Sequence, residues 1–140
     1  MYTTSDAGML AITRRADPLI ARVLSPSVRE HQAGALELTL RSVAREARGK
    51  LILVMDDVQQ LTSAGVNALV TGSNLCREHG GRMVLVGLKR DLVDLFRSTG
   101  LDRTLTIAMH HDDAMAYFHG RHAPVGARKG KAAAKRKRAA

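Results

Sequence analysis

Two short runs of uninterrupted apolar residues constrain the fold of this chain more than any other feature. They are Leu51–Met55 and Met83–Gly87. A strand with one face in water alternates apolar and polar residues, whereas a strand covered on both faces is apolar throughout. Both runs are too short for a typical helix, so they are predicted to be central strands of a sheet that is covered on both sides.

Stretches with helical spacing surround these two runs. Between about His31 and Arg48, apolar residues recur at i, i+4, i+7, i+8 and i+11, which places them on one face of a helix. Further helices are predicted over Ser63–Glu78, Arg90–Ser98 and Asp112–Phe118, and glycines follow the first three helices, as C-terminal caps do. Strands that alternate with helices in this way are typical of a parallel sheet with right-handed crossovers.

Three further strands complete the predicted order. Met9–Arg14 and Leu19–Leu24 flank the turn signal Asp17-Pro18 and indicate a hairpin, and Leu105–Ala108 is the last short strand. The predicted fold class is α/β, with a mixed, mainly parallel sheet of four to five strands and helices packed on it. We predict one domain over residues 9–119, after a flexible N-terminus at residues 1–8.

The positive charge of the chain is concentrated at its C-terminal end. The formal net charge is +9, but residues 121–140 alone carry eight Lys and Arg side chains and no acidic one. The other residues carry 14 basic and 13 acidic side chains, so the predicted domain is nearly neutral. Residues 120–140 cannot bury enough apolar surface to offset chain entropy, and they are predicted to form a basic disordered tail.

The composition excludes several classes of function. Aromatic residues make up only 3% of the chain, too few for a stacking surface that binds RNA bases. The single cysteine, Cys76, excludes an internal disulfide and indicates a reducing compartment. The chain has no apolar run long enough for a transmembrane segment and no secretory signal pattern, so we expect a cytoplasmic protein.

Potential catalytic and metal-binding groups are better explained by structural roles. Neither a dinucleotide fingerprint nor a phosphate loop occurs, so no cofactor and no enzymatic activity are expected. The cluster His110–Asp113 does not predict a metal site, because successive side chains of a strand or helix start diverge. Asp56 and Asp57 lack a third ligand at a suitable spacing. Cys76 lies on the predicted buried stripe of the helix Ser63–Glu78, together with Val66, Leu69, Val70 and Ser73.

The order of elements between Leu51 and Leu105 is distinctive. The order is an apolar strand, a connector, a Thr-Ser-Ala-Gly sequence that opens a helix, a Gly-Gly turn, a second apolar strand, a helix and a Gly-Leu pair. These elements are Leu51–Met55, Asp56–Leu61, Thr62–Gly65, Gly80-Gly81, Met83–Gly87, Arg90–Ser98 and Gly100-Leu101. In order and spacing they resemble the central part of a STAS domain, the fold shared by bacterial anti-sigma factor antagonists and the cytoplasmic ends of sulfate transporters. More loosely, the resemblance covers Met9–Phe118.

The resemblance implies an anti-sigma factor antagonist that acts by partner switching. In phosphorylation-controlled members, a partner serine kinase modifies the first serine after the opening residue of the motif. That position falls on Ser63, with Thr62 as the weaker alternative. The unmodified protein then captures an anti-sigma factor, typically the kinase itself, and so frees a sigma factor. Phosphorylation releases the anti-sigma factor, and a phosphatase resets the cycle.

The resemblance also implies a partner-binding surface around this serine. Its predicted members are Asp56, Asp57, Thr62, Ser63, Ala64, Gly65 and Arg29. Three residues depart from the better-known pattern. Thr62 and Val54 stand where the pattern often has Asp, and Arg29 stands where an acidic residue is frequent.

Elementary chemistry gives the pair Thr62-Ser63 two interpretations. Thr and Ser favour the start of a helix because their hydroxyls cap unpaired backbone N–H groups. The same N–H groups and the helix dipole also accommodate a phosphate. A phosphate adds roughly −1.5 to −2 charges and disrupts an interface that packs around a bare hydroxyl. Capping alone and a phosphorylated switch are both open from the sequence.

Two other functions are open as well. A STAS scaffold without a phosphoswitch would act as a subunit of a transport or signalling complex, with Ser63 only capping its helix. The basic tail, with its charge block of Lys135, Arg136, Lys137 and Arg138, is either a solubilising appendage or an attachment to nucleic acid or an acidic protein. Attachment to nucleic acid through such a tail would be salt-sensitive and independent of base sequence.

Overall fold

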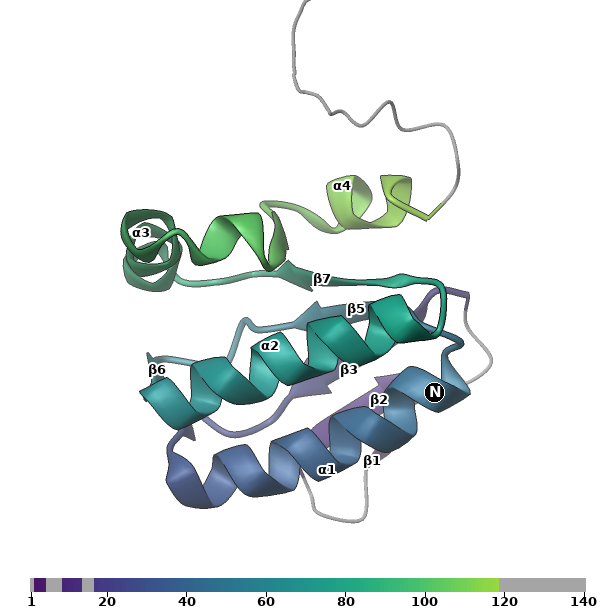
Figure 1. Cartoon of the computed structure of the whole chain (residues 1–140), viewed down its shortest axis with the longest axis horizontal. Helices are drawn as coiled ribbons and strands as arrows, with labels where there is room; N and C mark the ends of the chain where they lie inside the picture. The colour runs from purple at the N-terminus through teal and green to yellow at the C-terminus, as the bar shows by residue number, and fades with distance from the viewer. Residues whose placement is uncertain (1, 5–8, 14–16, 119–140) are drawn as a thin grey trace, which may run out of the picture.

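The computed structural model describes residues 2–4, 9–13 and 17–118 of the chain. In chain order, the elements are β1 (Tyr2–Thr4), β2 (Leu10–Thr13), β3 (Leu19–Val23), β4 (Ser27–Val28), α1 (Glu30–Glu46), β5 (Lys50–Val54), β6 (Gln60–Leu61), α2 (Ser63–Glu78), β7 (Arg82–Val86), α3 (Arg90–Thr99), the 3-10 turn η1 (Leu101–Arg103), β8 (Thr106–Ala108) and α4 (His111–Ala116). Helices α1 and α2 lie side by side on one face of the main sheet, and α4 lies on the opposite face (Figure 1).

The main sheet has the strand order β1-β2-β3-β5-β7-β8. The pairs β1–β2 and β2–β3 are antiparallel, whereas β3–β5, β5–β7 and β7–β8 are parallel. Strand β5 is central, and its Ile52 lies opposite Ile20 of β3 and Val84 of β7. The predicted α/β class with a mixed, mainly parallel sheet is therefore confirmed.

Three strands differ from the sequence expectation. Strand β1 lies within the stretch predicted to be a flexible N-terminus, so the sheet has six strands instead of four to five. Strands β4 and β6 form a separate small parallel sheet: β6 lies in the predicted connector Asp56–Leu61, and β4 lies between the predicted strand Leu19–Leu24 and the first predicted helix. Each of these two strands has only two residues, which is too few to leave a periodic pattern in the sequence.

The core lies on both faces of the central strands. Alternate residues of a strand point to opposite faces. Leu51 and Leu53 of β5, and Met55 directly after it, join the cluster under α1 and α2, while Ile52 and Val54 of β5 join a second cluster with α4. The uninterrupted apolar run in the sequence therefore has the cause that was predicted for it.

Helix α2 covers exactly the predicted range, but its buried face is rotated relative to the predicted stripe. Leu69, Ser73 and Cys76 of that stripe are buried, whereas Val66 and Val70 are only half-buried. The buried face consists largely of small residues: Gly65, Ala68, Leu69, Gly72, Ser73 and Cys76. Gly72 allows α2 to approach α1 closely, because a Cβ at this position would lie 2.8 Å from a side-chain atom of Leu40.

The structure describes only part of each end of the chain. Strand β1 is the only part of residues 1–8 that the structure describes, and the predicted basic tail, with Lys135–Arg138, lies outside the described residues. Within the described ranges, no helix is both long and apolar enough to span a membrane.

Candidate functional site

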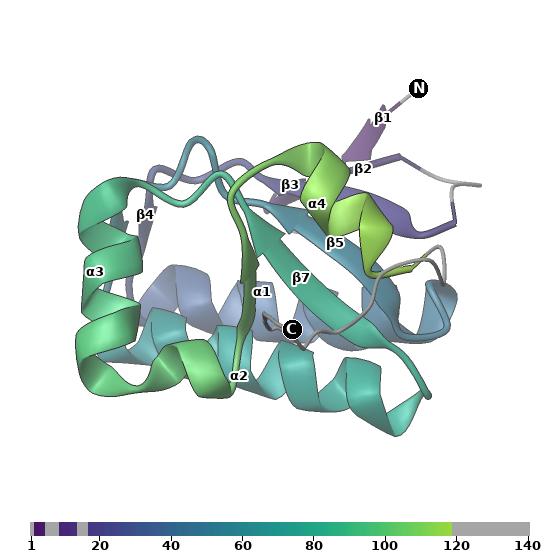
Figure 2. The ribbon, with the colours of Figure 1, turned by 90° about the horizontal axis from the view of Figure 1, so that it is seen from above.

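The candidate site lies at the end of the sheet where β5 and β7 finish and where α2 and α3 begin (Figure 2). Open α/β sheets usually bind ligands at this edge. The small sheet of β4 and β6 is part of it, with Val28 opposite Leu61. The Pro26 carbonyl accepts hydrogen bonds from the N–H groups of Gln59 and Gln60 at 2.7 and 3.1 Å. These contacts fix the path of the chain into α2.

Thr62 is the N-cap of α2 and holds the helix start against β4. Its hydroxyl accepts a hydrogen bond from the Gly65 N–H at 3.4 Å and donates one to the Val28 carbonyl at 3.1 Å. The Thr62 backbone N–H donates to the same carbonyl, also at 3.1 Å. An N-cap of this kind is typically worth about 1 kcal/mol. The capping role therefore belongs to Thr62.

Ser63 is the first residue of α2, and its side chain is exposed. No other residue that the structure describes forms a hydrogen bond with its hydroxyl. The first turn of α2 contains no acidic residue. The Ser63 hydroxyl is therefore accessible at the positive end of a helix whose charge is not offset by an acidic side chain within that turn.

Gly65 determines how closely the first turn of α2 approaches β4. A Cβ at this position would lie 2.6 Å from the Val28 carbonyl oxygen and 3.1 Å from side-chain atoms of Leu61 and Val28. Gly65 is buried, and Ala64 before it is half-buried against the core. The glycine of the motif thus positions the two hydroxyls and contributes little to the outer surface.

The other predicted partner-binding residues lie at the same end of the sheet. Asp56 and Asp57 follow β5 and are exposed. Asp57 forms an ion pair with Arg22 at 3.3 Å, and an exposed pair of this kind adds little stability. Arg29 is the exposed N-cap of α1 and directly follows Val28, whose carbonyl holds Thr62. This end of the sheet therefore carries exposed side chains of both charges.

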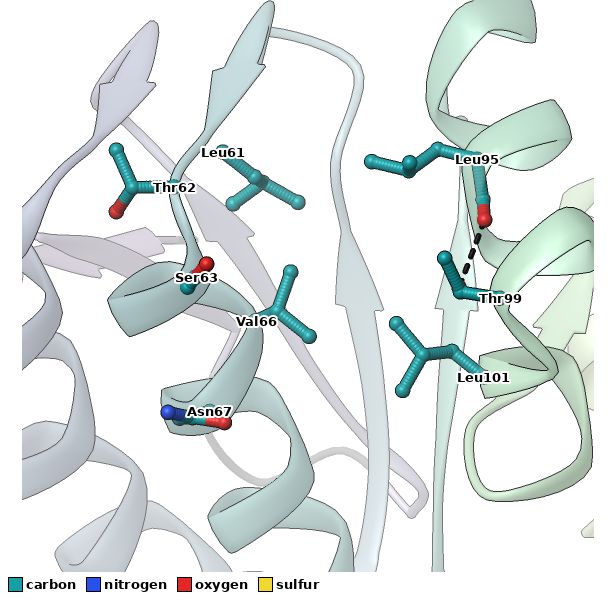
Figure 3. A pocket seen from close by; sticks show the side chains of 8 residues that line it. All are labelled: Leu61, Thr62, Ser63, Val66, Asn67, Leu95, Thr99 and Leu101. Atoms are coloured by element: carbon teal, nitrogen blue, oxygen red, sulfur yellow. Dashed lines mark hydrogen bonds between the residues drawn. The ribbon is translucent and has the colours of Figure 1, made fainter.

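A pocket of about 310 Å³ opens beside Ser63 (Figure 3). Its lining comes from β6, α2, α3 and η1 and consists of Leu61, Thr62, Ser63, Val66, Asn67, Leu95, Thr99 and Leu101. Leu61 and Val66 face Leu95 and Leu101 across the opening, whereas the Thr62 side chain points away toward β4 (Figure 3). None of the lining side chains is ionisable: four are aliphatic, and the other four carry a hydroxyl or an amide group.

The patterns in the sequence did not predict this pocket. Its two walls are brought together by the fold, because the first comes from β6 and α2 and the second from α3 and η1. One signal was available in the sequence: α3 carries a fourth large apolar residue, Leu95, in addition to Leu92, Val93 and Phe96, which it buries. Leu95 is 42% exposed, and such a residue next to a serine is a candidate contact.

Other reactive side chains have structural surroundings. Within the residues that the structure describes, no three His, Cys, Asp or Glu side chains form a group suited to a metal ion. His110 is the N-cap of α4, and Asp112 and Asp113 lie in its first turn, where acidic residues are favourable. Cys76 is buried, and burial raises the pKa of its thiol to about 12, so the thiol stays protonated near neutral pH.

Comparison with known protein families matches the STAS domain over residues 10–114. This match covers more than half of the chain, and the chain therefore belongs to the STAS domain family. A search of curated proteins found no match.

Solved structures show the same fold. An anti-sigma factor antagonist from Mycobacterium paratuberculosis has 20% identity and a TM-score of 0.68, with 83% of this chain and 98% of that chain covered. The unphosphorylated form of the anti-sigma factor antagonist SpoIIAA of Bacillus has 11% identity and a TM-score of 0.56, with coverage of 76% and 94%. The murine anion transporter Slc26a9 has 17% identity and a TM-score of 0.61, with 75% of this chain but only 18% of the transporter covered. At these identities the likeness establishes the fold.

Proposed function

We propose that this protein is an anti-sigma factor antagonist whose binding to an anti-sigma factor is switched by phosphorylation of Ser63. One observation carries the proposal: Thr62 caps α2, and the neighbouring Ser63 hydroxyl is exposed and takes no part in holding the helix. A serine that is needed for capping would have to break a structural hydrogen bond to receive a phosphate. The Ser63 hydroxyl forms no such hydrogen bond with a residue that the structure describes, whereas the Thr62 hydroxyl forms two.

The electrostatics of the first turn support the same assignment. A phosphate at Ser63 would stand beside the unpaired N–H groups of α2, where a negative charge is favourable. The domain would therefore keep its fold when it is phosphorylated. A partner that packs closely around the hydroxyl would instead have to accommodate a hydrated dianion, and it would be released.

In this proposal the protein acts by binding, without a catalytic step of its own. The partner supplies the serine kinase activity, and a separate phosphatase restores the hydroxyl. The exposed residues Asp56, Asp57 and Arg29 would form the polar rim of the interface. The similar structures from Mycobacterium paratuberculosis and of SpoIIAA are anti-sigma factor antagonists, and SpoIIAA has been solved in a phosphorylated form.

The test is a binding measurement with each purified anti-sigma factor of the source genome that carries an ATP-dependent serine kinase domain. We expect calorimetry to detect a complex with one of them for the wild-type protein and for Ser63→Ala. Ser63→Glu should bind at least about ten-fold more weakly, because a charge left unpaired in an interface is costly. Equal affinity of wild type and Ser63→Glu would contradict a switch at this residue.

A second candidate function is a STAS scaffold within a transport or signalling complex. The observation that favours it is the likeness to the STAS-sized part of the anion transporter Slc26a9. In this case Ser63 would serve only as the first residue of α2. Recovery of membrane transport components together with the protein, and no binding to any kinase-type anti-sigma factor, would favour the scaffold.

A further inference from the structure

The pocket beside Ser63 has the features of a socket for a single apolar side chain. Leu61, Val66 and Leu101 are half-buried and pack on the main core, while Leu95 is 42% exposed. The other four lining residues are polar but uncharged, and the centre of a protein–protein contact is typically depleted of charged residues. We propose that this pocket receives one aliphatic side chain, of leucine size, from the anti-sigma factor. This inference rests on the proposed function.

The lining argues against a charged metabolite as the occupant. Small-molecule sites usually fix their ligand with a few charged or strongly polar groups that converge on it. None of the eight lining residues is ionisable, and the Thr99 hydroxyl already donates to the Leu95 carbonyl at 2.8 Å. A neutral apolar group therefore fits this lining better than a phosphate or a carboxylate.

The charges on α3 indicate what surrounds the inserted side chain. Asp91 lies one helical turn before Leu95 and is exposed on the same side of α3. Arg90 and Arg97 lie five residues before and two residues after Leu95, which places them on the far side of the helix. Asp91 thus places one carboxylate beside Leu95, and a Lys or Arg next to the aliphatic residue of the partner would complement it.

The position of Ser63 in the pocket wall explains how a phosphate would act. Ser63 lies beside Leu61 and Val66 in the lining (Figure 3), so a phosphate on this residue would lie next to these aliphatic side chains. It would attract the basic residue of the partner, but an exposed ion pair contributes little. The free-energy cost of burying the dianion against four aliphatic side chains exceeds the free energy gained from that attraction. The net effect is that the aliphatic side chain no longer enters.

The first experiment tests the pocket without any partner protein. Isopentanol (3-methyl-1-butanol) carries the branched end of a leucine side chain and serves as the probe in a methyl-resolved NMR titration of the full chain. We expect shifts concentrated at Leu61, Val66, Leu95 and Leu101. Leu38 on α1, which is 68% exposed, is the matched control and should not shift. Shifts at Leu38 as large as those at Leu95 would overturn the pocket as a specific site.

The second experiment uses the purified anti-sigma factor that binds the wild-type protein. Leu95→Ala should raise Kd by about 10- to 30-fold, as truncation of a central contact residue does, while Leu38→Ala should stay within about two-fold. Both leucines are exposed, so circular dichroism and the thermal midpoint should match wild type. Ser63→Glu should also lower affinity less in the Leu95→Ala background than in wild type, because both changes act on one pocket.

The outcomes separate this inference from the proposed function. If wild type binds an anti-sigma factor and Leu95→Ala binds equally well, the pocket assignment fails while the proposed function stands. If no anti-sigma factor binds, the proposed function fails, and with it the identity of the occupant. Sedimentation that shows wild type to be a dimer, and Leu95→Asp a monomer, would identify a second copy of the chain as the occupant and overturn the assignment to a partner.

Discussion

The starts of α1 and α2 are neighbours in the fold and yet differ in chemistry. Strand β4 leads into α1, strand β6 leads into α2, and the two strands pair in parallel. At α1 the first residue is the acidic Glu30, and the Gln32 side chain accepts a hydrogen bond from the Arg29 N–H at 3.2 Å. At α2 the first residue is Ser63, and no acidic residue follows it in the first turn.

This difference shows where the molecule has room for an added charge. An acidic side chain already offsets the positive end of α1, whereas the positive end of α2 carries only a capping hydroxyl and a free one. The two helix starts therefore differ in charge, and under the proposed function the start of α2 is the one that receives the phosphate.

The largest expected effect on stability comes from alanine substitutions at two helical glycines, which should act in opposite directions. A Cβ at Gly65 would meet the Val28 carbonyl at 2.6 Å, whereas a Cβ at Gly34 on α1 would meet nothing within 4 Å. Gly65→Ala should therefore destabilise the fold by about 2 kcal/mol through overpacking against backbone. Gly34→Ala should stabilise it by about 1 kcal/mol, the difference in helix propensity. Urea unfolding measures both, and equal effects would contradict the close approach of α2 to β4.

The next effect tests the division of labour between the two hydroxyls. Thr62→Ala removes the cap and should lower the free energy of unfolding by about 1 kcal/mol, while Thr62→Ser should recover most of that loss. Ser63→Ala should change it by less than about 0.5 kcal/mol, as exposed substitutions usually do. A larger loss for Ser63→Ala than for Thr62→Ala would reverse the roles assigned here.

The smallest expected effect comes from exchanging the first residues of the two helices. Ser63→Glu should stabilise the isolated domain by about 0.3–1 kcal/mol at low salt, because it adds a negative charge at the positive end of α2. Glu30→Ser removes such a charge from α1 and should destabilise the domain by a similar amount. Thermal unfolding at two salt concentrations checks both, and the effects should shrink as salt rises. Clear destabilisation by Ser63→Glu would show that the first turn of α2 does not tolerate the charge.

The sequence was sufficient for the parts of the fold that leave a periodic signal. The central strands at Leu51–Met55 and Met83–Gly87 were predictable because both faces are covered, and α2 was predictable because the Thr-Ser-Ala-Gly motif marks its start. Strand β1 and the two-residue strands β4 and β6 were not predictable, since their pairing comes from the tertiary arrangement.

The same limit applied to the site. The sequence placed two hydroxyls at a helix start, but it did not show which of them caps the helix. That depends on the Val28 carbonyl, which lies 34 residues before Thr62 in the chain. The pocket depended in the same way on Leu95 and Leu101, which reach Ser63 only through the packing of α3 and η1.

The central claim is that the exposed hydroxyl of Ser63 is the group that a partner kinase modifies. The most direct measurement is intact-mass analysis with peptide mapping after incubation with ATP and the kinase-type anti-sigma factor that binds the protein. Wild type and Thr62→Val should gain one phosphate, mapped to Ser63 in both, and Ser63→Ala should gain none. Phosphate incorporation into Ser63→Ala equal to that of wild type would contradict the account.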